Sequence, residues 1–470
     1  MEINYQELGF RCGLEVHQQL HGKKLFCSCP TLNSDKNPDV HVERKLRAVA
    51  GETGDVDIAA EFEMSKDRKF IYESSYEDTC LVEYDEEPPH ELNKQAIGTA
   101  IKVALLINAE IVDEIQIMRK TVVDGSNVSG FQRTALVAMN GFVETSMGKV
   151  SIQTICLEEE AAQKIEEGND FVRYKLDRLG IPLIELATSA DIKSPEHAKE
   201  VAGQIGMILR SVEGVKRGLG TIRQDVNISV NEGTRTEIKG FQDLKSIPKV
   251  IEYEVKRQLE AIKQGKQLKK EVRKAEPDFT TSFLRPLPGA ARLYPETDVL
   301  PVRIGTAHIE ELRKELPKLL TEKIDECAKK YNITKEIAKD LVGNGDFEYL
   351  KQKFRNKDVW VIIRALTNTP KEIRQKLGIE DFEEVLDYYY DGKIAKEAIM
   401  DLLEKKSLGE KIKISDFEAV SEEQLEKEIK KIINEKPGLN ASAYMGLVMA
   451  KYRGKVDGKK VMELVGRLIK

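Results

Sequence analysis

Cysteine is scarce in this sequence, with six residues spread over a chain of 470. Cysteines so few and so scattered do not make the disulfide framework of a small secreted domain. No apolar run approaches the roughly 20 residues that span a bilayer. The N-terminal stretch MEINYQELGF lacks the basic and apolar regions of a signal peptide. We therefore predict a cytoplasmic protein with reduced thiols and no membrane contact.

Several catalytic motifs are missing as well. The chain has no G-x-x-x-x-G-K-[ST], no G-x-G-x-x-G that opens a helix, and no G-x-S-x-G, so any bound ATP does not sit on a P-loop. The stretch HQQLH, from His17 to His21, lacks the glutamate of the H-E-x-x-H zinc-protease motif. It also begins on a strand-like segment, where positions i and i+4 do not form the one-face helix geometry of that motif. A zinc protease is disfavoured.

The pattern of apolar residues that is present differs between the two parts of the chain. Up to about Leu300, strand-like alternation dominates, with turn signals at Asn140-Gly141 and Met147-Gly148 and a hairpin around residues 231–233. Helical periodicity appears in residues 93–106, 195–212 and 248–263, and after Pro301 it continues nearly throughout.

Acidic residues recur on the predicted strand faces. Glu15 and His17 are two positions apart and therefore share a face. Other polar residues follow the same alternation, and Glu185 lies inside an apolar strand; the further candidates are Arg223, Asp225, Asn227, Glu237, Lys239, Glu158 and Glu159. Each alone is read most simply as a solvent-facing strand residue. Together, carboxylates with one imidazole and nearby Lys and Arg favour a hard-cation site that handles phosphate, with Mg²⁺ or Mn²⁺ preferred over zinc.

The C-terminal end is basic. From residue 436 onward the chain has eight Lys or Arg against Asp457 and Glu463, although the whole chain carries a net charge of −6. Such a segment suggests a module that binds a polyanion. A solvated lysine-rich helix pair explains the charge equally well.

Long motifs in this chain resemble those of a known family. They are CGLEVHQQL, KLFCSCP, DGSNVSGFQRTALVA, TICLEEEAA, LDRLGIPLIELAT, TIRQDVNIS, TEIKGFQDL, RPLPGAARLYPETDV and, in the tail, NASAYMGLVMAKYRGKVDGKKVMELVGRLI. They are similar, in the same order, to the E subunits of archaeal glutamyl-tRNA(Gln) amidotransferases, which are relatives of the B subunit in the bacterial enzyme. One departure is that the family's inserted domain, similar to one in bacterial aspartyl-tRNA synthetases, is missing before RPLPGAAR. Because that domain is thought to contact tRNA, its loss puts tRNA affinity and selectivity in doubt.

The resemblance implies a fold and a division into domains. We expect an α+β protein, with an antiparallel-sheet cradle domain in residues 1–303, a helical domain in residues 304–394 and a small helical tail domain that binds tRNA in residues 395–470.

The resemblance also implies a reaction. Family members phosphorylate the γ-carboxylate of glutamate carried on tRNA(Gln) with ATP, and ammonia then displaces the phosphate. In the archaeal type, an asparaginase-like D subunit supplies the ammonia, and we expect a dimer of heterodimers. Carried over by position, Glu15, His17, Glu159, Glu185 and Glu237 are the expected Mg²⁺ ligands, while Lys120, Glu159, Arg223 and Lys239 are the expected catalytic residues. Arg223 and Lys239 are interpreted equally well as partners of Asp225 and Glu237. A catalytically inactive tRNA-binding relative is the alternative function, and a stand-alone kinase of a small acid is disfavoured by the basic tail.

Cys27-x-Cys29 is a separate feature. Some bacterial relatives add a second cysteine pair shortly afterwards, which would make a four-thiolate zinc site. No such pair follows here, so Cys80 or Cys12 would have to complete a structural zinc site.

Overall fold

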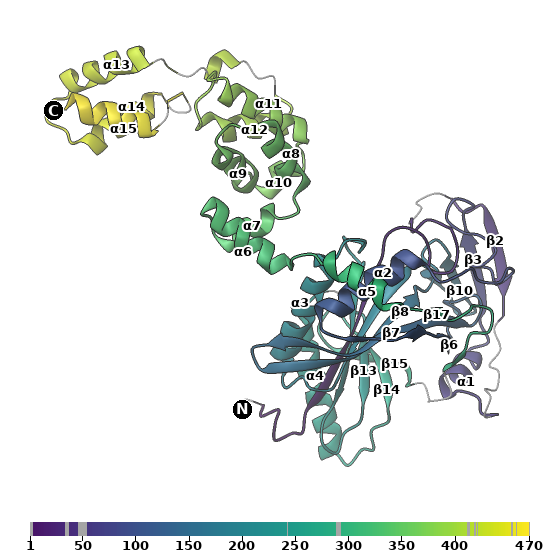
Figure 1. Ribbon diagram of the computed structural model, residues 1–470. Coiled ribbons are helices and arrows are strands. Elements are labelled where there is room, and N and C mark those ends of the chain that lie inside the picture. The colour runs from purple at the N-terminus through teal and green to yellow at the C-terminus, as the bar shows by residue number, and fades with distance from the viewer. Residues whose placement is uncertain are drawn as a thin grey trace. The chain divides into compact units, whose positions relative to one another are not determined.

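The computed structural model describes residues 3–32, 37–45, 54–241, 243–287, 293–410, 414–417, 420, 422–452, 455–456 and 458–469 (Figure 1). The chain divides into two compact units, Met1–Leu320 and Thr321–Lys470. Within the described ranges, every helix is too short or too polar to cross a membrane.

A large, mostly antiparallel sheet forms the centre of the first unit. Its strands lie in the order β15-β14-β13-β12-β1-β11-β8-β7-β6-β16, and β4 pairs with β7 beside this path. Of the pairings along the path, the one between β13 and β14 is parallel. The strands are β1 (Arg11–Gln19), β4 (Glu110–Ile111), β6 (Ile117–Thr121), β7 (Phe131–Thr145), β8 (Gly148–Glu159), β11 (Pro182–Thr188), β12 (Ile222–Ser229), β13 (Thr236–Lys239), β14 (Glu271–Ala275), β15 (Thr281–Pro286) and β16 (Leu293–Pro295).

Two smaller sheets complete the strands. One has the order β2-β3-β10-β9 and the other pairs β17 with β5. These strands are β2 (Val40–Arg44), β3 (Lys69–Ser74), β5 (Glu114–Ile115), β9 (Gln163–Glu167), β10 (Phe171–Lys175) and β17 (Val302–Arg303). The short helix α1 (Ile58–Met64) packs against β15.

Three amphipathic helices pack along one face of the large sheet: α2 (Lys94–Leu106), α3 (Pro195–Ser211) and α4 (Ser246–Lys263) (Figure 1). The first two begin at side-chain caps, because Asn93 and Ser194 accept hydrogen bonds from backbone N–H groups of the first turn. Their apolar faces bury the core of the unit against alternate residues of the strands, such as Leu14 and Val16 of β1. The α+β class and these three helices are confirmed, with α4 beginning two residues before the predicted proline.

The predicted turn at Asn140-Gly141 is wrong. Strand β7 continues through this dipeptide, and Gly141 pairs with Ile152 of β8. Asn140 has a positive φ of 58°, which is the conformation that gives Asn-Gly its turn signal. Here that conformation interrupts a long strand without ending it. The true turn of this hairpin lies between Thr145 and Gly148, as the second signal predicts.

The helix α5 (Thr306–Lys314) belongs to the first unit, where it packs on α2. The second unit has two separate hydrophobic clusters, one reaching Leu403 and one beginning at Leu425. The three predicted domain boundaries stay a prediction, and of the predicted basic tail Arg453, Asp457 and Lys470 lie outside the described residues. The helices of this unit are α6 (Leu320–Tyr331), α7 (Lys335–Leu341), α8 (Gly345–Lys353), α9 (Val359–Asn368), α10 (Lys371–Arg374), α11 (Ile379–Tyr390), α12 (Ala398–Ser407), η2 (Ile414–Phe417), α13 (Glu422–Glu435), α14 (Ala441–Lys451) and α15 (Gly458–Leu468).

Candidate active site

The strand register gathers polar side chains on the sheet face opposite the core. Directly opposite residues of an antiparallel pair share a face. His17 of β1 lies opposite Glu185 of β11 on one side and opposite Arg223 of β12 on the other. Glu15 likewise lies opposite Asp225. Because Leu14 and Val16 point into the core, alternation directs Glu15 and His17 away from it.

This polar face is the floor of a cleft of about 770 Å³. Lys120 of β6 and Arg285 of β15 both line it, although β6 and β15 lie near opposite ends of the sheet path. The cleft therefore draws its lining from nearly the full width of the sheet.

His17, Glu158 and Glu185 form the first acidic group in the cleft, with one ligand atom from each lying within 4.8 Å of the others. His17 Nε2 is 3.3 Å from Glu185 Oε2 and 3.9 Å from Glu158 Oε2. Lys120 Nζ is 3.2 Å from Glu158 Oε1 and 3.6 Å from Glu185 Oε2. Both carboxylates are buried, at 2% and 8% exposure. A single lysine therefore faces two buried acids at once.

Crowding shifts the pKa values in this group. Burial and the charge of Glu185 raise the pKa of Glu158 to about 7. Burial opposes ionisation of Glu185, but Lys120 and His17 hold the pKa of Glu185 well below its usual range. Burial would lower the pKa of His17, yet its contact with Glu185 raises that pKa to about 9. The group thus gains stability from any positive charge placed among its oxygens.

Glu15, Asp225 and Glu237 form the second acidic group, with the same mutual spacing. Lys239 Nζ lies 2.5 Å from Asp225 Oδ2 and 2.7 Å from Glu237 Oε1. Burial is the largest cause that raises the pKa of Glu15, followed by the charges of Glu185 and Glu237. The predicted pairing of Lys239 with these acids is observed, and the same ammonium lines the cleft.

Arg223 pairs with a different acid from the one expected. Its guanidinium donates a 2.8 Å hydrogen bond to Glu160 Oε1 rather than to Asp225. Glu160 also accepts a 3.0 Å hydrogen bond from Gln19. Arg223 still lines the cleft, with 38% of its side chain exposed.

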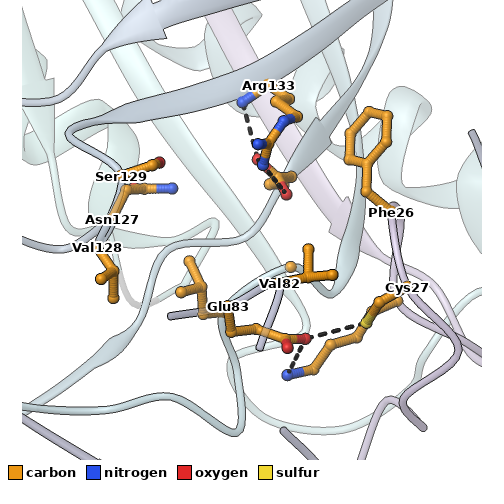
Figure 2. Close-up of a pocket in the computed structure, with 12 residues that line it drawn as sticks. Phe26, Cys27, Val82, Glu83, Asn127, Val128, Ser129 and Arg133 are labelled. Carbon is orange, nitrogen blue, oxygen red and sulfur yellow. Dashed lines mark hydrogen bonds and ion pairs between the residues drawn. The ribbon is translucent and has the colours of Figure 1, made fainter. Parts of the chain in front are cut away.

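The expectation that Glu159 joins the metal-binding acids is corrected by its position. Glu159 is directed to the other side of β8, where it pairs with Arg133 at 3.3 Å. Both residues line a small cavity of about 20 Å³, and Figure 2 shows Arg133 there beside Phe26. The reason is alternation, because Leu157 is a core residue and residues two apart share a face. Glu158, one position earlier, therefore takes the place expected for Glu159.

The structure brings together Glu15, His17, Lys120, Glu185, Glu237 and Lys239, with Arg223 lining the same cleft. The metal-binding and catalytic roles expected of them stay predictions. Glu158 and Asp225, which were candidates from the sequence but not among the expected ligands or catalytic residues, also belong to the site, and so does Gln132, which the sequence did not indicate. Gln132 Nε2 donates a 3.2 Å hydrogen bond to Glu158 Oε2. The core residues Ile155 and Leu157 indicate that Glu158 points away from the core. The approach of Gln132 depends instead on the pairing of β7 with β8. Arranged in this way, carboxylates and cations suit a bound hard cation and a phosphorylated ligand.

Comparisons with known proteins agree with the motif resemblance. Residues 10–310 match the model of the GatB/GatE catalytic domain. The chain is 38% identical to the E subunit of the glutamyl-tRNA(Gln) amidotransferase of Methanocaldococcus jannaschii, with all of both chains covered. The proteins of the same name from Archaeoglobus fulgidus and Saccharolobus solfataricus are 36% and 34% identical, covering 100% of this chain and 99% of each relative. The first alignment spans 628 positions against 470 residues here, which fits a missing inserted domain.

Proposed function

Because the chain belongs to the GatB/GatE family, we propose that it is a tRNA-dependent amidotransferase that converts glutamate on tRNA(Gln) to glutamine. The observation that carries this proposal is the cleft itself. It places two groups of carboxylates and the cations Lys120, Arg223 and Lys239 on one concave surface. A protein that only bound the anionic tRNA would gain nothing from clustered acids there.

The proposed reaction has two steps. A γ-carboxylate oxygen of the tRNA-bound glutamate attacks the terminal phosphorus of ATP, and ADP leaves. Ammonia then attacks the carbonyl carbon of the resulting acyl phosphate, and inorganic phosphate leaves with the proton that ammonia loses. Overall the reaction forms a carbon–nitrogen bond at the expense of ATP, which is the chemistry of a ligase. Positioning and positive charge accomplish most of such a phosphoryl transfer.

The donor set suits Mg²⁺. Glu185 Oε2 is buried and accepts no hydrogen bond in the described part of the chain, as expected of an oxygen that serves a cation. Carboxylate oxygens with one imidazole match the preference of hard divalent ions for oxygen ligands. We propose that Glu185, His17 and Glu158 hold one such ion, with Glu15, Asp225 and Glu237 beside it. Bound there, Mg²⁺ would neutralise charge on the transferred phosphoryl group.

The side chains of the cleft have roles of their own in this proposal. Lys120 contacts both Glu158 and Glu185, so its ammonium would orient the reacting carboxylate or phosphate beside the ion. Lys239 and Arg223 line the same cleft and would bind phosphate oxygens. Gln132 holds Glu158 by a hydrogen bond and so would fix the direction of that carboxylate.

The ammonia would come from a partner. The described lining of the cleft contains no serine, threonine or cysteine that could attack an amide. This supports a division of labour in which an asparaginase-like D subunit releases ammonia from asparagine. We propose that the two proteins assemble as a dimer of heterodimers in the cytoplasm.

Reconstitution tests the proposal. The protein is mixed with the D subunit, ATP, Mg²⁺, asparagine and glutamyl-tRNA(Gln), and the amino acid on the tRNA is identified after deacylation. We expect glutaminyl-tRNA, and none when either protein or ATP is omitted. Binding of glutamyl-tRNA without ATP-dependent amidation would support the alternative of an inactive tRNA-binding relative.

A further inference from the structure

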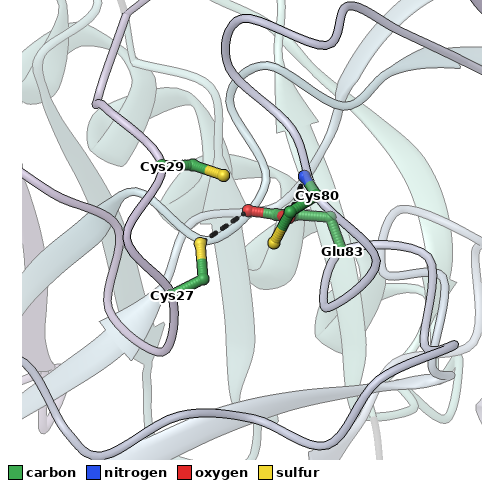
Figure 3. Close-up of side chains that lie close together, drawn as sticks. All are labelled: Cys27, Cys29, Cys80 and Glu83. Carbon is green, nitrogen blue, oxygen red and sulfur yellow. Dashed lines mark hydrogen bonds between the residues drawn. The ribbon is translucent and has the colours of Figure 1, made fainter.

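Three cysteines and one glutamate converge in the first unit, outside the cleft. One donor atom from each of Cys27, Cys29, Cys80 and Glu83 lies within 4.8 Å of the other three (Figure 3). None of these four residues lines the cleft. The two pairs come from loops that are about fifty residues apart in the sequence.

Backbone contacts position both loops. The first loop is closed by the bridge between Lys23 and Pro30 and by a 2.9 Å hydrogen bond from Lys24 N to Cys29 O. Cys27 and Cys29 therefore lie within one narrow turn. In the second loop, Cys80 N donates a 2.9 Å hydrogen bond to a carboxylate oxygen of Glu83. The four donors are thus held in place by the fold of each loop.

The polar contacts within the cluster are unusual for a protein interior. Cys27 Sγ donates to Glu83 Oε1 at 3.1 Å, and Lys24 Nζ lies 3.0 Å from the same oxygen. Glu83 is 5% exposed and Lys24 is 1% exposed, so a carboxyl group and an amine are buried side by side. Three thiols and a buried carboxyl group therefore lie within reach of one another, beside a buried lysine.

We propose that Cys27, Cys29, Cys80 and Glu83 bind one zinc ion. Thiolates with a carboxylate form a donor set that zinc accepts in tetrahedral geometry, whereas Mg²⁺ and Ca²⁺ require oxygen ligands. With Zn–S bonds of about 2.3 Å, the donors of a tetrahedral site lie about 3.8 Å apart. Donors that already lie within 4.8 Å of one another need only a small contraction. Of the two cysteines that could complete Cys27-x-Cys29, Cys80 is the one in place, because Cys12 is a core residue of β1.

The fourth ligand links the ion to a buried charge pair. When Glu83 binds the metal, Lys24 keeps its 3.2 Å hydrogen bond to the Leu176 carbonyl. Glu83 and Cys27 also line the small cavity that contains Arg133 (Figure 2). The ion would therefore fasten two loops to each other at the wall of that cavity, as a structural cross-link with no part in the chemistry of the cleft.

Metal content tests this proposal on the whole chain. The reduced protein is purified without chelator, its zinc is quantified by mass spectrometry, and Co²⁺ is then titrated into metal-free protein while thiolate-to-metal absorption is recorded. We expect one equivalent of zinc and a Co²⁺ thiolate band of tetrahedral type. Reduced protein that binds neither metal, or cluster cysteines that form a disulfide in place of metal binding, would overturn the proposal.

Matched variants assign the ligands. Cys29→Ser and Cys80→Ser should lose the bound zinc, while Cys327→Ser should retain it, because Cys327 packs in the second unit. Loss of a residue that only orients a metal ligand weakens metal binding by roughly tenfold or more. Because Glu83 is itself a proposed ligand, Glu83→Gln should weaken zinc binding by more than about tenfold. Unchanged zinc affinity in Glu83→Gln would show that Glu83 is not a ligand. Full zinc content in both serine variants would refute the zinc site as a whole. None of these measurements depends on amidation.

Discussion

Three consecutive glutamates at the end of β8 have three different surroundings. Glu158 faces the cleft beside Lys120, Glu159 pairs with Arg133 on the opposite side of the strand, and Glu160 binds Arg223. The three side chains are chemically identical, so differences between their substitutions must come from where each carboxylate lies. This gives a direct test of which carboxylate serves the reaction.

Substitution of Glu158 and Glu159 should separate activity from stability. We expect Glu158→Gln to reduce amidation about a hundredfold or more, equivalent to ~2.7 kcal/mol of barrier, without loss of fold. Glu159→Gln should retain most activity but lower the free energy of unfolding by about 3 kcal/mol, because it breaks a buried ion pair. Amidation assays and urea unfolding measure the two effects. Equal loss of activity in both variants would contradict the assignment.

Glu296 should make stability depend on pH in the acid range. Burial alone would raise its pKa, but ion pairs with Arg119 and Arg133 lower it to about 2. Since the folded pKa lies below the ordinary value near 4.5, this group stabilises the fold fully above pH 4.5. That stabilisation is lost as the pH falls toward 2. Unfolding measured across this window should show a difference between the natural protein and Glu296→Gln that shrinks with acid, and a constant difference would refute the prediction.

At the scale of elements, the N-cap residue of α2, Asn93, makes two sets of hydrogen bonds. Asn93 Oδ1 accepts hydrogen bonds from Gln95 N and Ala96 N at 2.9 and 3.1 Å. Its Nδ2 donates to the carbonyls of Lys23 and Lys24 at 2.9 and 3.2 Å, next to the loop that contains Cys27. One side chain thus joins the helix to that loop.

Substitutions at Asn93 should distinguish these two sets of hydrogen bonds. Asn93→Ala should lower the free energy of unfolding by about 1–2 kcal/mol, because the cap is lost. Asn93→Asp keeps the acceptor and should recover part of that loss, while it still lacks the two bonds to the loop. Urea denaturation of the three proteins checks the order, and an alanine variant as stable as the natural protein would refute it.

How far the sequence predicts each element depends on how local its determinants are. Strand β1, the β12–β13 hairpin and helix α2 follow from alternation, turn residues and a cap within a few positions. The strand through Asn140-Gly141 escapes such reasoning, because pairing with β8 overrides a local turn signal. The assignment of Glu159 to the metal site follows the positions of related proteins and is wrong. The core residues Ile155 and Leu157 place Glu159 on their own side of the strand, away from the cleft. Cys29 and Cys80 come from two loops that are distant in sequence. The spacing of the cysteines therefore cannot show which of them approaches Cys29.

At the scale of the whole molecule, α13, α14 and α15 pack around one small core that includes Leu425, Ile429 and Val448. A deletion that begins after α13 would expose the apolar face of that helix. Basic residues of this group are partly neutralised, since Lys451 Nζ lies 2.6 Å from Glu428. Val420 packs on this core, whereas Ile414 and Phe417 pack on the other cluster of the unit. The clean deletion therefore removes residues 420–470 together.

Deletion of residues 420–470 should weaken tRNA binding and reduce its dependence on salt. Each lost phosphate contact should reduce the slope of log affinity against log salt by somewhat less than one unit. Amidation at saturating glutamyl-tRNA should change less, because the acidic groups lie in the first unit. Binding measured at several salt concentrations tests this, and an unchanged affinity and slope would leave tRNA binding to the rest of the chain.

The two ends of the large sheet are close in sequence although they are far apart in strand order. Strand β15 ends at Pro286 and β16 begins at Leu293, and these strands are the two ends of a path of ten. Laid flat, ten strands at ~4.8 Å spacing would separate the ends by about 43 Å, whereas seven residue steps reach about 25 Å at most. The sheet must therefore curl, and this explains how Arg285 of β15 and Lys120 of β6 can line one cleft although many strands separate them.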